Sequence, residues 1–418
     1  MHARHLAPIL TAAALAAFVA CGSSSSDTTS PPKPTAQPDA GNVVDAAADD
    51  SGLYVPVLPA WLTSATVIAN GHAADDLLLD CRTVICRHNE DTDMTTFNGA
   101  IYFVHRTAIS QTLGPNSALH VYKSTDGGKT FAQTALIPAP VDRDLRDPAF
   151  FEVNGVLHLK ALTRIPTSEI DSGDGSRDTG VDTVTVGMQS TDGTTWTAMT
   201  PIGPHGWSFW RIKKQGDTYY SAAYQDGDQS VVLYSSTDGV TWTAGATIYG
   251  VSADTPLETE LTFMPSGRML ALVRMDGTDA ELLGDQGRLR TKTCWATAPY
   301  TTFDCSTELD GQRLDGPLTF FWESRLFVVG RKHLQGTGKK RTSLFEITGT
   351  LEGGPIVIHE IGELPSAGDT SYAGVAMADA THAVVSWYSG DIPQDEVWAL
   401  GMFAVTDGWM GTIDLSKL

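Results

Sequence analysis

The chain repeats one short motif three times, as Ser124-Thr-Asp-Gly-Gly-Lys-Thr-Phe131, Ser190-Thr-Asp-Gly-Thr-Thr-Trp196 and Ser236-Thr-Asp-Gly-Val-Thr-Trp242. Each copy follows a β-rich run, at residues 118–122, 184–188 and 231–234. The aspartate in such a motif hydrogen-bonds to its own turn, the glycine supplies a positive φ, and the closing aromatic ring fills the space between strands. Three copies of this hairpin therefore predict short four-stranded sheets repeated around an axis.

The sequence on either side of these motifs is also rich in β-forming residues. Short runs at residues 100–105, 156–160, 269–273 and 325–329 each follow a turn signal such as Asn98-Gly99. No long stretch has the apolar period of a helix. We therefore expect one all-β domain, a β-propeller over residues 55–418, with six blades or, as the alternative, five.

The three motifs resemble the Asp box, or BNR repeat, of the sialidase-like β-propellers. The first copy is similar to the eight-residue form of the box, with Phe131 in place of tryptophan, and the other two copies are one residue shorter. The resemblance implies that the boxes lie on the outer hairpins of the blades and have a structural role.

The N-terminus predicts export. A basic start leads into an apolar stretch at residues 8–19, which is too short to cross about 30 Å of hydrocarbon. Residues 18–21, Phe-Val-Ala-Cys, resemble the bacterial lipobox, so residues 1–21 are expected to be a lipoprotein signal peptide that leaves Cys21 lipidated. Residues 22–54 have almost no large apolar side chain and are expected to form a disordered linker. We expect an exported protein held by its lipid to a bacterial membrane, in particular the outer membrane, with an ordinary secretory signal as the alternative.

Cysteine count and charge limit the other expectations. The cysteines after Cys21 are Cys81, Cys86, Cys294 and Cys305, an even number that suits disulfides outside the cytoplasm. We expect the pairs Cys81–Cys86 and Cys294–Cys305, although the sequence leaves the other two connectivities open. The formal net charge of −21 argues against nucleic acid as a partner, because phosphate contacts need clustered Lys and Arg. We expect a monomer that requires no cofactor and no metal.

A second resemblance to sialidases lies in the later part of the chain. Residues 258–274 are similar to the family segment in which a glutamate, here Glu258, precedes a strand that ends in an arginine, here Arg274. Residues 316–331 end in Arg331, at the place of another family arginine, and residues 368–374 resemble the segment of the catalytic tyrosine, here Tyr372. Arg87 is the match for the first family arginine, in a segment that lacks the usual Arg-Ile-Pro.

Chemistry explains why such residues would converge. Three guanidinium groups can hold a planar carboxylate through charge-assisted hydrogen bonds. A tyrosine beside a carboxylate base can attack an anomeric carbon, and this neutral nucleophile suits an anionic sugar that would repel a carboxylate. The resemblance thus implies Tyr372 as the nucleophile, Glu258 as its base, and Arg87, Arg274 and Arg331 as substrate-binding residues.

The usual acid/base of the family has no match. Sialidases carry an aspartate shortly before the first Asp box, whereas residues 107–117 contain no carboxylate. Asp147, in Asp144-Leu-Arg-Asp-Pro148, is the first replacement candidate, because Arg-Asp-Pro before a strand recurs in other glycosidase propellers. Asp93 and Glu90 follow it as candidates. The alternative is that Asp147 only caps a turn against Arg146.

Further pocket residues are expected near these segments. The stretch at residues 205–211 contains two tryptophans and an arginine, and exposed aromatic rings stack on sugar faces. We expect Trp207 and Arg211 to line the pocket and Trp210 to be part of the core. Arg146 and Asp369 complete the expected substrate-binding set, and Tyr388 is expected to have a packing role.

Two functions of different classes follow from the sequence. The first is a cell-surface, sialidase-like glycoside hydrolase that acts on an anionic or otherwise decorated glycan by a retaining mechanism. The alternative is a non-catalytic propeller lipoprotein that binds a glycan or a protein. The Tyr–Glu pair favours the hydrolase, and the missing acid/base favours the binding protein.

The lipid anchor predicts the effect of one substitution. Cys21→Ser should release the protein from the membrane fraction, because a diacyl anchor needs this thiol. The measurement is fractionation of cells that have been labelled metabolically with a fatty acid. A mutant that stays in the membrane fraction and still carries the label would contradict the lipobox assignment.

Overall fold

The computed structural model describes residues 53–74, 79–112, 114–166, 181–225, 230–252, 255–276, 291–308 and 313–418. The expected signal peptide, Cys21 and all but the last two residues of the expected linker lie outside the described residues.

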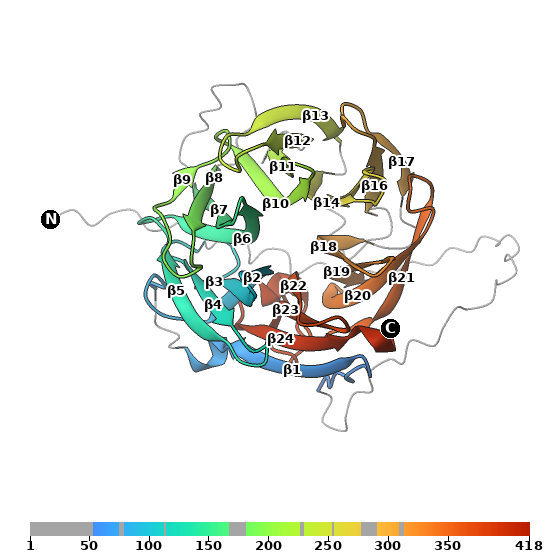
Figure 1. Cartoon of the computed structure of the whole chain (residues 1–418). Helices are drawn as coiled ribbons and strands as arrows, with labels where there is room; N and C mark the ends of the chain where they lie inside the picture. Colours follow the sequence, from blue (N-terminus) through green and yellow to red (C-terminus); the bar gives the residue numbers. More distant parts are fainter. Residues whose placement is uncertain are drawn as a thin grey trace, which may run out of the picture. The chain divides into compact units, whose positions relative to one another are not determined.

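The described strands form antiparallel sets of four that follow one another around a ring (Figure 1). We call each set a blade and number the blades in chain order. The blades that are separate four-stranded sheets are blade 2, with β6 (Asp144–Val153), β7 (Val156–Pro166), β8 (Val181–Ser190) and β9 (Thr200–Pro201); blade 3, with β10 (Trp207–Gln215), β11 (Thr218–Gln225), β12 (Val231–Ser236) and β13 (Thr243–Tyr249); blade 4, with β14 (Pro256–Phe263), β15 (Met269–Met275), β16 (Lys292–Ala296) and β17 (Asp304–Glu308); and blade 5, with β18 (Leu314–Trp322), β19 (Arg325–Leu334), β20 (Lys339–Gly349) and β21 (Ile356–Glu363).

The ring closes where the two ends of the described chain meet. Blade 1 has β2 (His88–Phe97), β3 (Ala100–Ala108), β4 (Ala118–Ser124) and β5 (Ala132–Pro138), and blade 6 has β22 (Thr370–Met377), β23 (His382–Gly390), β24 (Thr406–Asp414) and β1 (Leu62–Ala69). Strand β1 pairs antiparallel with β24, and β2 meets β24 through the pair His88 and Thr406, so these two blades form one eight-stranded sheet. Closure in this way ties the first blade to the last. The prediction of an all-β propeller is confirmed.

Helices are short in the part of the chain that the structure describes. They are η1 (Gly71–Ala73), α2 (Trp398–Gly401) and η2 (Leu415–Lys417). None of the described helices has the length and apolar character that crossing a bilayer requires. The structure joins Cys81 to Cys86 and Cys294 to Cys305, which is the pairing expected from the sequence.

The Asp boxes connect the third and fourth strands of blades 1, 2 and 3. In the first box, Asp126 accepts hydrogen bonds from the backbone N–H groups of Lys129 and Thr130, both at 3.0 Å. In the third, the ring of Trp242 packs edge-on against Phe209 with 5.3 Å between centroids. The boxes therefore act as the self-capped, ring-plugged turns that their sequence predicts.

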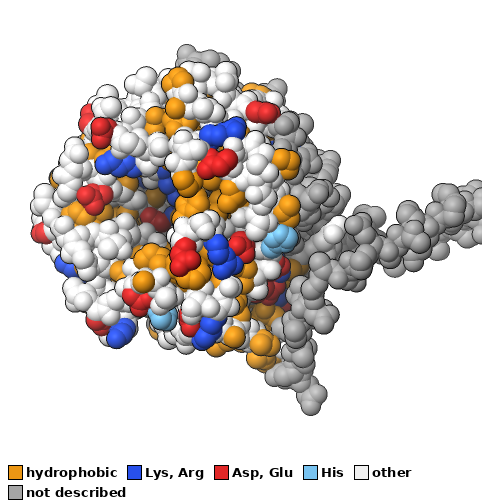
Figure 2. Space-filling view, turned by 45° about the vertical axis from the view of Figure 1, so that its right-hand side comes forward, with side chains coloured by type: hydrophobic (Ala, Val, Ile, Leu, Met, Phe, Trp, Pro, Cys, Tyr) orange, Lys and Arg blue, Asp and Glu red, His pale blue; other side chains and the backbone are white. Residues whose placement is uncertain are grey.

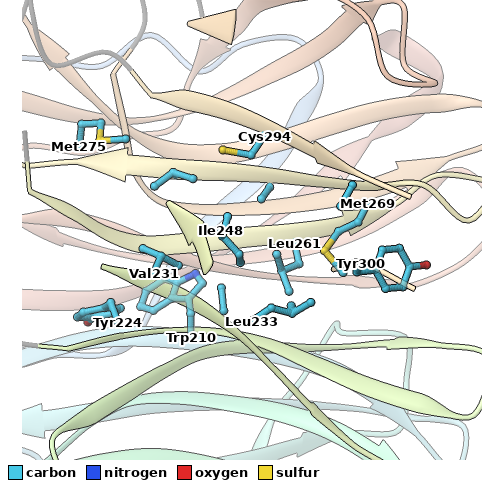
Figure 3. Close-up of a cluster of buried hydrophobic side chains, with 14 of the residues drawn as sticks. Trp210, Tyr224, Val231, Leu233, Ile248, Leu261, Met269, Met275, Cys294 and Tyr300 are labelled. Carbon is cyan, nitrogen blue, oxygen red and sulfur yellow. The ribbon is translucent and has the colours of Figure 1, made fainter. Parts of the chain in front are cut away.

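The apolar core lies between neighbouring blades. Figure 3 shows the cluster that joins blade 3 to blade 4, in which Trp210 and Val231 face Leu261 and Met269. Every residue of β15 is buried, as expected for a strand covered on both faces. On the face seen in Figure 2, acidic and basic side chains are interspersed rather than gathered into one patch.

Each innermost strand has a β-bulge at the same level. The pairing between first and second strands shifts register between Glu90 and Asp93, Arg146 and Ala149, Phe209 and Ile212, Pro256 and Thr259, Asp315 and Leu318, and Ser371 and Gly374. A bulge bends its strand and turns a side chain out of the regular ladder. The bulged residues include Asp91, Asp147, Trp210, Glu258, Gly316 and Tyr372. The repeated bulge thus turns side chains of several blades out of their sheets.

Backbone conformation marks several of these positions as strained. The φ angles are 52° at Asp91, 49° at Asp147 and 45° at Tyr372. Residues other than glycine seldom adopt a positive φ, and such outliers concentrate at functional sites. In blade 5 the bulge residue is Gly316, with a φ of 54°, and a Cβ there would lie 2.9 Å from Cδ1 of Tyr372. Glycine at this position gives the tyrosine ring its space.

This contact predicts the effect of Gly316→Ala. The substitution should lower the free energy of unfolding by about 1–3 kcal/mol more than Gly216→Ala, because overpacking against Tyr372 adds to the backbone strain. Gly216 is the matched control, since its φ is 60° and a Cβ there would meet nothing within 4 Å. Urea unfolding followed by tryptophan fluorescence measures both variants. Equal losses of stability would mean that Tyr372 does not pack on the bulge.

Candidate active site at the propeller axis

Tyr372 and Glu258 form a hydrogen-bonded pair between blades 6 and 4. The Tyr372 hydroxyl donates to Oε1 of Glu258 at 2.6 Å. Arg274 of β15 donates through Nη1 to Oε2 of Glu258 at 2.7 Å and to the Tyr372 hydroxyl at 3.1 Å. The backbone N–H of Gly316 lies 3.3 Å from the same Oε2. The carboxylate is therefore held on both oxygens, with one oxygen facing the phenolic proton.

Burial keeps this phenol in its protonated form. Burial, together with the negative charge of Glu258, raises the pKa of Tyr372 well above its usual value, although Arg274 and Arg331 oppose the shift. Tyr372 is only 8% exposed. A phenol in this state becomes a nucleophile only when its proton passes to an adjacent base, and Glu258 is in the position to take it.

The two arginines of this region are paired with carboxylates of the protein. Arg331 of β19 stacks over the Tyr372 ring at 5.3 Å, and its Nη1 donates to Oδ1 of Asp369 at 3.2 Å. Arg274 places Nη2 3.2 Å from Asp276 and Nε 3.3 Å from Asp315. Burial favours the neutral form of Asp315, but the surrounding arginines hold the pKa of its carboxyl well below the usual range. These charges are compensated inside the protein.

Asp369 binds Arg331 and is not among the residues that line the cavity described below. Its Oδ1 also accepts hydrogen bonds from Trp398 Nε1 at 2.9 Å and from the Tyr388 hydroxyl at 3.2 Å. The Tyr388 ring in turn stacks on Tyr372, with 6.1 Å between centroids. Asp369 and Tyr388 thus fix the positions of Arg331 and Tyr372 from behind.

Asp147 and Tyr372 line one cavity. This cavity is lined by Asp91, Thr92, Asp147, Pro148, Ala149, Lys160, Trp210, Arg211 and Tyr372. The bulges of blades 1, 2, 3 and 6 all contribute to it. The acid/base candidate that the sequence suggested therefore faces the same space as the candidate nucleophile.

Two acids and a lysine set the electrostatics of this cavity. The backbone N–H of Asp147 lies 3.3 Å from Oδ2 of Asp91, and Lys160 Nζ donates to the Asp147 carbonyl at 2.7 Å. Burial raises the pKa of Asp147, with Glu258 adding to the shift and Arg146 and Lys160 opposing it. Burial likewise raises the pKa of Asp91 and lowers that of Lys160, to about 8.

The structure places Trp210 in the core, as expected, whereas Trp207 is not among the residues that line the cavity. Trp210 belongs to the apolar cluster of Figure 3, and it also lines the cavity, where it packs edge-on against Tyr372 at 5.7 Å. Trp207 begins β10, ahead of the bulge, and packs against Tyr234 at 5.7 Å. Arg211 lines the cavity as expected, and its Nη2 donates to the Ala373 carbonyl at 2.6 Å. Its Nη1 forms an ion pair with Asp93, so the Asp93 carboxylate compensates the charge of Arg211.

Arg87 does not stand at the bulge of blade 1. It precedes β2, and its Nη2 approaches the Phe403 carbonyl at 3.5 Å. Asp91 occupies the bulge instead. The buried arginine of this blade is Arg106, which pairs in register with Glu90 as Arg331 pairs with Asp315 in blade 5. The sequence signal for Arg106 was the same as for Arg274 and Arg331, an arginine near the end of a second strand.

Buried ion pairs extend from Arg106 to blade 2. Arg106 donates to both oxygens of Asp144, at 2.9 and 2.8 Å, and pairs with Glu90. Arg146 contacts the same Glu90 oxygen at 3.1 Å. Arg146 and Glu90 thus belong to a structural network beneath the cavity rather than to its lining.

A buried group of possible metal ligands adjoins this network. It consists of His88, Glu90 and Asp369, with ligand atoms within 4.8 Å of one another. His88 Nε2 lies 3.2 Å from Glu90 and 3.7 Å from Asp369. Burial disfavours a charged imidazole, but the two carboxylates raise the pKa of His88 to about 9. A protonated histidine therefore balances these acids at neutral pH.

Comparisons with known proteins bear on the fold. No protein-family model and no curated protein matches the sequence. Among solved structures, a protein of unknown function from Dyadobacter fermentans DSM 18053 superposes with a TM-score of 0.60 at 16% identity, over 84% of this chain and 98% of that chain. The intramolecular trans-sialidase from Ruminococcus gnavus, in complex with oseltamivir carboxylate, gives a TM-score of 0.60 at 11% identity, over 84% and 99%. The leech intramolecular trans-sialidase gives a TM-score of 0.59 at 12% sequence identity, over 79% of this chain and 69% of that chain. The protein thus has the fold of a sialidase-like β-propeller.

Proposed function

We propose that this protein is a retaining glycoside hydrolase with Tyr372 as its nucleophile. The observation that carries the proposal is the 2.6 Å hydrogen bond from Tyr372 to Glu258 beside a cavity that Asp147 also lines. Tyrosine nucleophiles are an established exception to the usual pair of carboxylates in glycoside hydrolysis. The sialidase-like fold supports the proposal, while the chemistry rests on the site itself.

The proposed reaction has two steps. In the first, the Tyr372 oxygen bonds to the anomeric carbon as its proton passes to Glu258, and the bond to the leaving-group oxygen breaks as Asp147 protonates that oxygen. In the second, Asp147 takes a proton from water, the water oxygen replaces the tyrosine at the anomeric carbon, and Glu258 returns the proton to Tyr372. The two displacements together retain the anomeric configuration.

Asp147 has the surroundings that an acid catalyst needs. A general acid must hold its proton near the working pH, and burial raises the pKa of Asp147 in that direction. The groups that face it are Arg146 on its own strand, Lys160 and Arg164 from β7, Asp91 from β2 and Glu258 from β14.

The proposed location is the cell surface. A lipid on Cys21, followed by the linker, would hold the propeller at the membrane and leave its axial cavity open to external glycans. The second candidate function, a silent glycan-binding protein, is favoured by the lack of a carboxylate at residues 107–117.

The tyrosine mechanism predicts that Tyr372→Phe lowers kcat at least about 10³-fold, because the nucleophile is lost while the cavity keeps its shape. The matched control is Tyr388→Phe, which removes a hydroxyl bonded to Asp369 and not to Glu258. Rates are measured with p-nitrophenyl glycosides, after a screen of sugars has found a substrate. Turnover that survives Tyr372→Phe would exclude this nucleophile, and a wild type that binds glycans without turnover would favour the silent receptor.

The acid role of Asp147 predicts a distinct pH profile. Because Asp147 acts in its protonated form, kcat should fall as pH rises through its raised pKa, above the usual range of a carboxyl group. Asp147→Asn should remove this alkaline limb and lower kcat about 10²–10⁴-fold for a poor leaving group. The loss of kcat should be much smaller for a p-nitrophenyl glycoside, because p-nitrophenolate leaves without protonation. An unchanged profile, or equal losses with both leaving groups, would rule out Asp147 as the acid.

A further inference from the structure

We propose that the cavity takes a neutral sugar, one whose reacting ring carries no carboxylate. The inference rests on the proposed glycoside hydrolase function, because it names the substrate class of the same site. It starts from Asp315, which the sequence analysis did not single out.

Asp315 occupies the place among the arginines that a ligand carboxylate would need. It comes from β18, directly before the bulge at Gly316, and its side chain is fully buried. Its carboxylate lies 3.0 Å from Arg313 Nε and 3.2 Å from Arg331 Nε. Arg274 Nε, at 3.3 Å, and His333 Nε2, at 2.6 Å, complete the enclosure. A backbone-fixed internal carboxylate thus takes up the positive charge of this cluster.

The remaining contacts of Arg274 and Arg331 are also with carboxylates of the protein. Arg274 directs Nη1 to Glu258 and Nη2 to Asp276, at 2.7 and 3.2 Å. Arg331 directs Nη1 to Asp369 at 3.2 Å. Neither Arg274 nor Arg331 belongs to the lining of the cavity. An anionic ligand would have to displace an internal carboxylate to reach them, and a buried arginine pair is costly to break.

The cavity lining itself suits hydroxyl groups. Its acids are Asp91 and Asp147, whose carboxyl groups can exchange hydrogen bonds with sugar hydroxyls. Its basic groups are already engaged, because Lys160 Nζ donates to the carbonyls of Asp147 and Phe209, at 2.7 and 2.8 Å. Arg211 pairs with Asp93 and with the Ala373 carbonyl. Trp210 adds an aromatic surface for the apolar face of a sugar ring.

The test compares sugars that differ in one group. The full-length protein, purified in detergent, is assayed with p-nitrophenyl glycosides in pairs, β-glucoside with β-glucuronide and α-galactoside with α-galacturonide, and with the methylumbelliferyl glycoside of N-acetylneuraminic acid. We expect kcat/KM for a neutral member to exceed that of its acidic counterpart at least about 100-fold, because an acidic sugar would bury its carboxylate beside arginines that already pair with internal carboxylates. Preferred hydrolysis of a uronide or of the sialic acid glycoside would overturn the inference and leave the hydrolase function standing.

A binding assay tests the proposed substrate class independently of catalysis. Tyr372→Phe is applied to a glycan array that displays neutral and acidic terminal sugars, and retention by neutral termini is the expected result. Neutral binding without wild-type turnover would refute the hydrolase and keep the substrate class. Selective binding of acidic termini would overturn the class whether or not turnover occurs, and binding to no glycan would contradict both.

A variant tests the role of Asp315 directly. Asp315→Asn should raise kcat/KM for a uronide relative to its neutral partner at least about tenfold, because it removes the internal anion from the arginine cluster. The matched control is Asp144→Asn, which removes an equally buried carboxylate from Arg106, an arginine outside this cluster. An unchanged ratio in a variant that keeps the wild-type melting temperature would show that Asp315 does not set charge selection. Where the variant fails to fold, the substrate pairs on the wild type still decide the inference.

Discussion

The bulge at one level of each innermost strand is the constraint on which the candidate site depends. Regular antiparallel pairing would send alternate side chains to the two faces of a blade, into the packing between blades. The register shift in β22 instead turns Tyr372 out of the ladder, and the shift in β14 does the same for Glu258. These two strands belong to different blades. The hydrogen bond between the Tyr372 hydroxyl and the Glu258 carboxylate can form because the bulges of both strands lie at the same level. The positive φ of Tyr372 is part of this geometry, and the surrounding ladder holds it in place.

Charge balance is the second constraint, and it follows from the first. The bulges and the adjoining second strands bring arginines and acids into a region that is almost closed to water. An unpaired buried charge is strongly destabilising, so each arginine needs a carboxylate within reach. Asp315 meets this need for Arg331 and Arg274, and Asp144 meets it for Arg106. Arg274 and Arg331, which the sequence marks as candidate ligand-binding residues, therefore have their charges compensated inside the fold.

Part of this arrangement could be predicted from the sequence. The Asp boxes and turn signals encode local hairpins, so the all-β propeller followed from short-range rules. Glu258, Arg274, Arg331 and Tyr372 were found because each lies at a fixed offset from a turn or a strand end, and such offsets survive in the sequence. The contact between Tyr372 and Glu258, residues 114 apart, could be expected only from the family resemblance.

The rest of the candidate site could not be predicted, because the sequence does not show where the bulges fall. Whether Trp207 or Trp210 faces the cavity depends on where the bulge of β10 falls, and a shift of one residue moves a side chain to the other face. Arg87 was chosen by motif likeness, although the bulge of β2 begins beyond it, at Asp91. The role of Asp315 is not visible in the sequence, because it depends on the register that sets Arg331 opposite it and on Arg274 from blade 4.

The bulge also explains how one fold can hold different chemistry. The ladder on both sides of a bulge is kept by backbone hydrogen bonds, so the bulged residue can change without loss of the sheet. Within this one chain the first residue of the bulge is an aspartate in blades 1 and 2, a tryptophan in blade 3, a leucine in blade 4, a glycine in blade 5 and a tyrosine in blade 6. The backbone similarity to sialidases at 10–12% identity is therefore compatible with a different substrate. What the axis binds is decided by the residues at the bulges and by the charges that remain uncompensated beside them, and Asp315 leaves little positive charge for an anionic ligand.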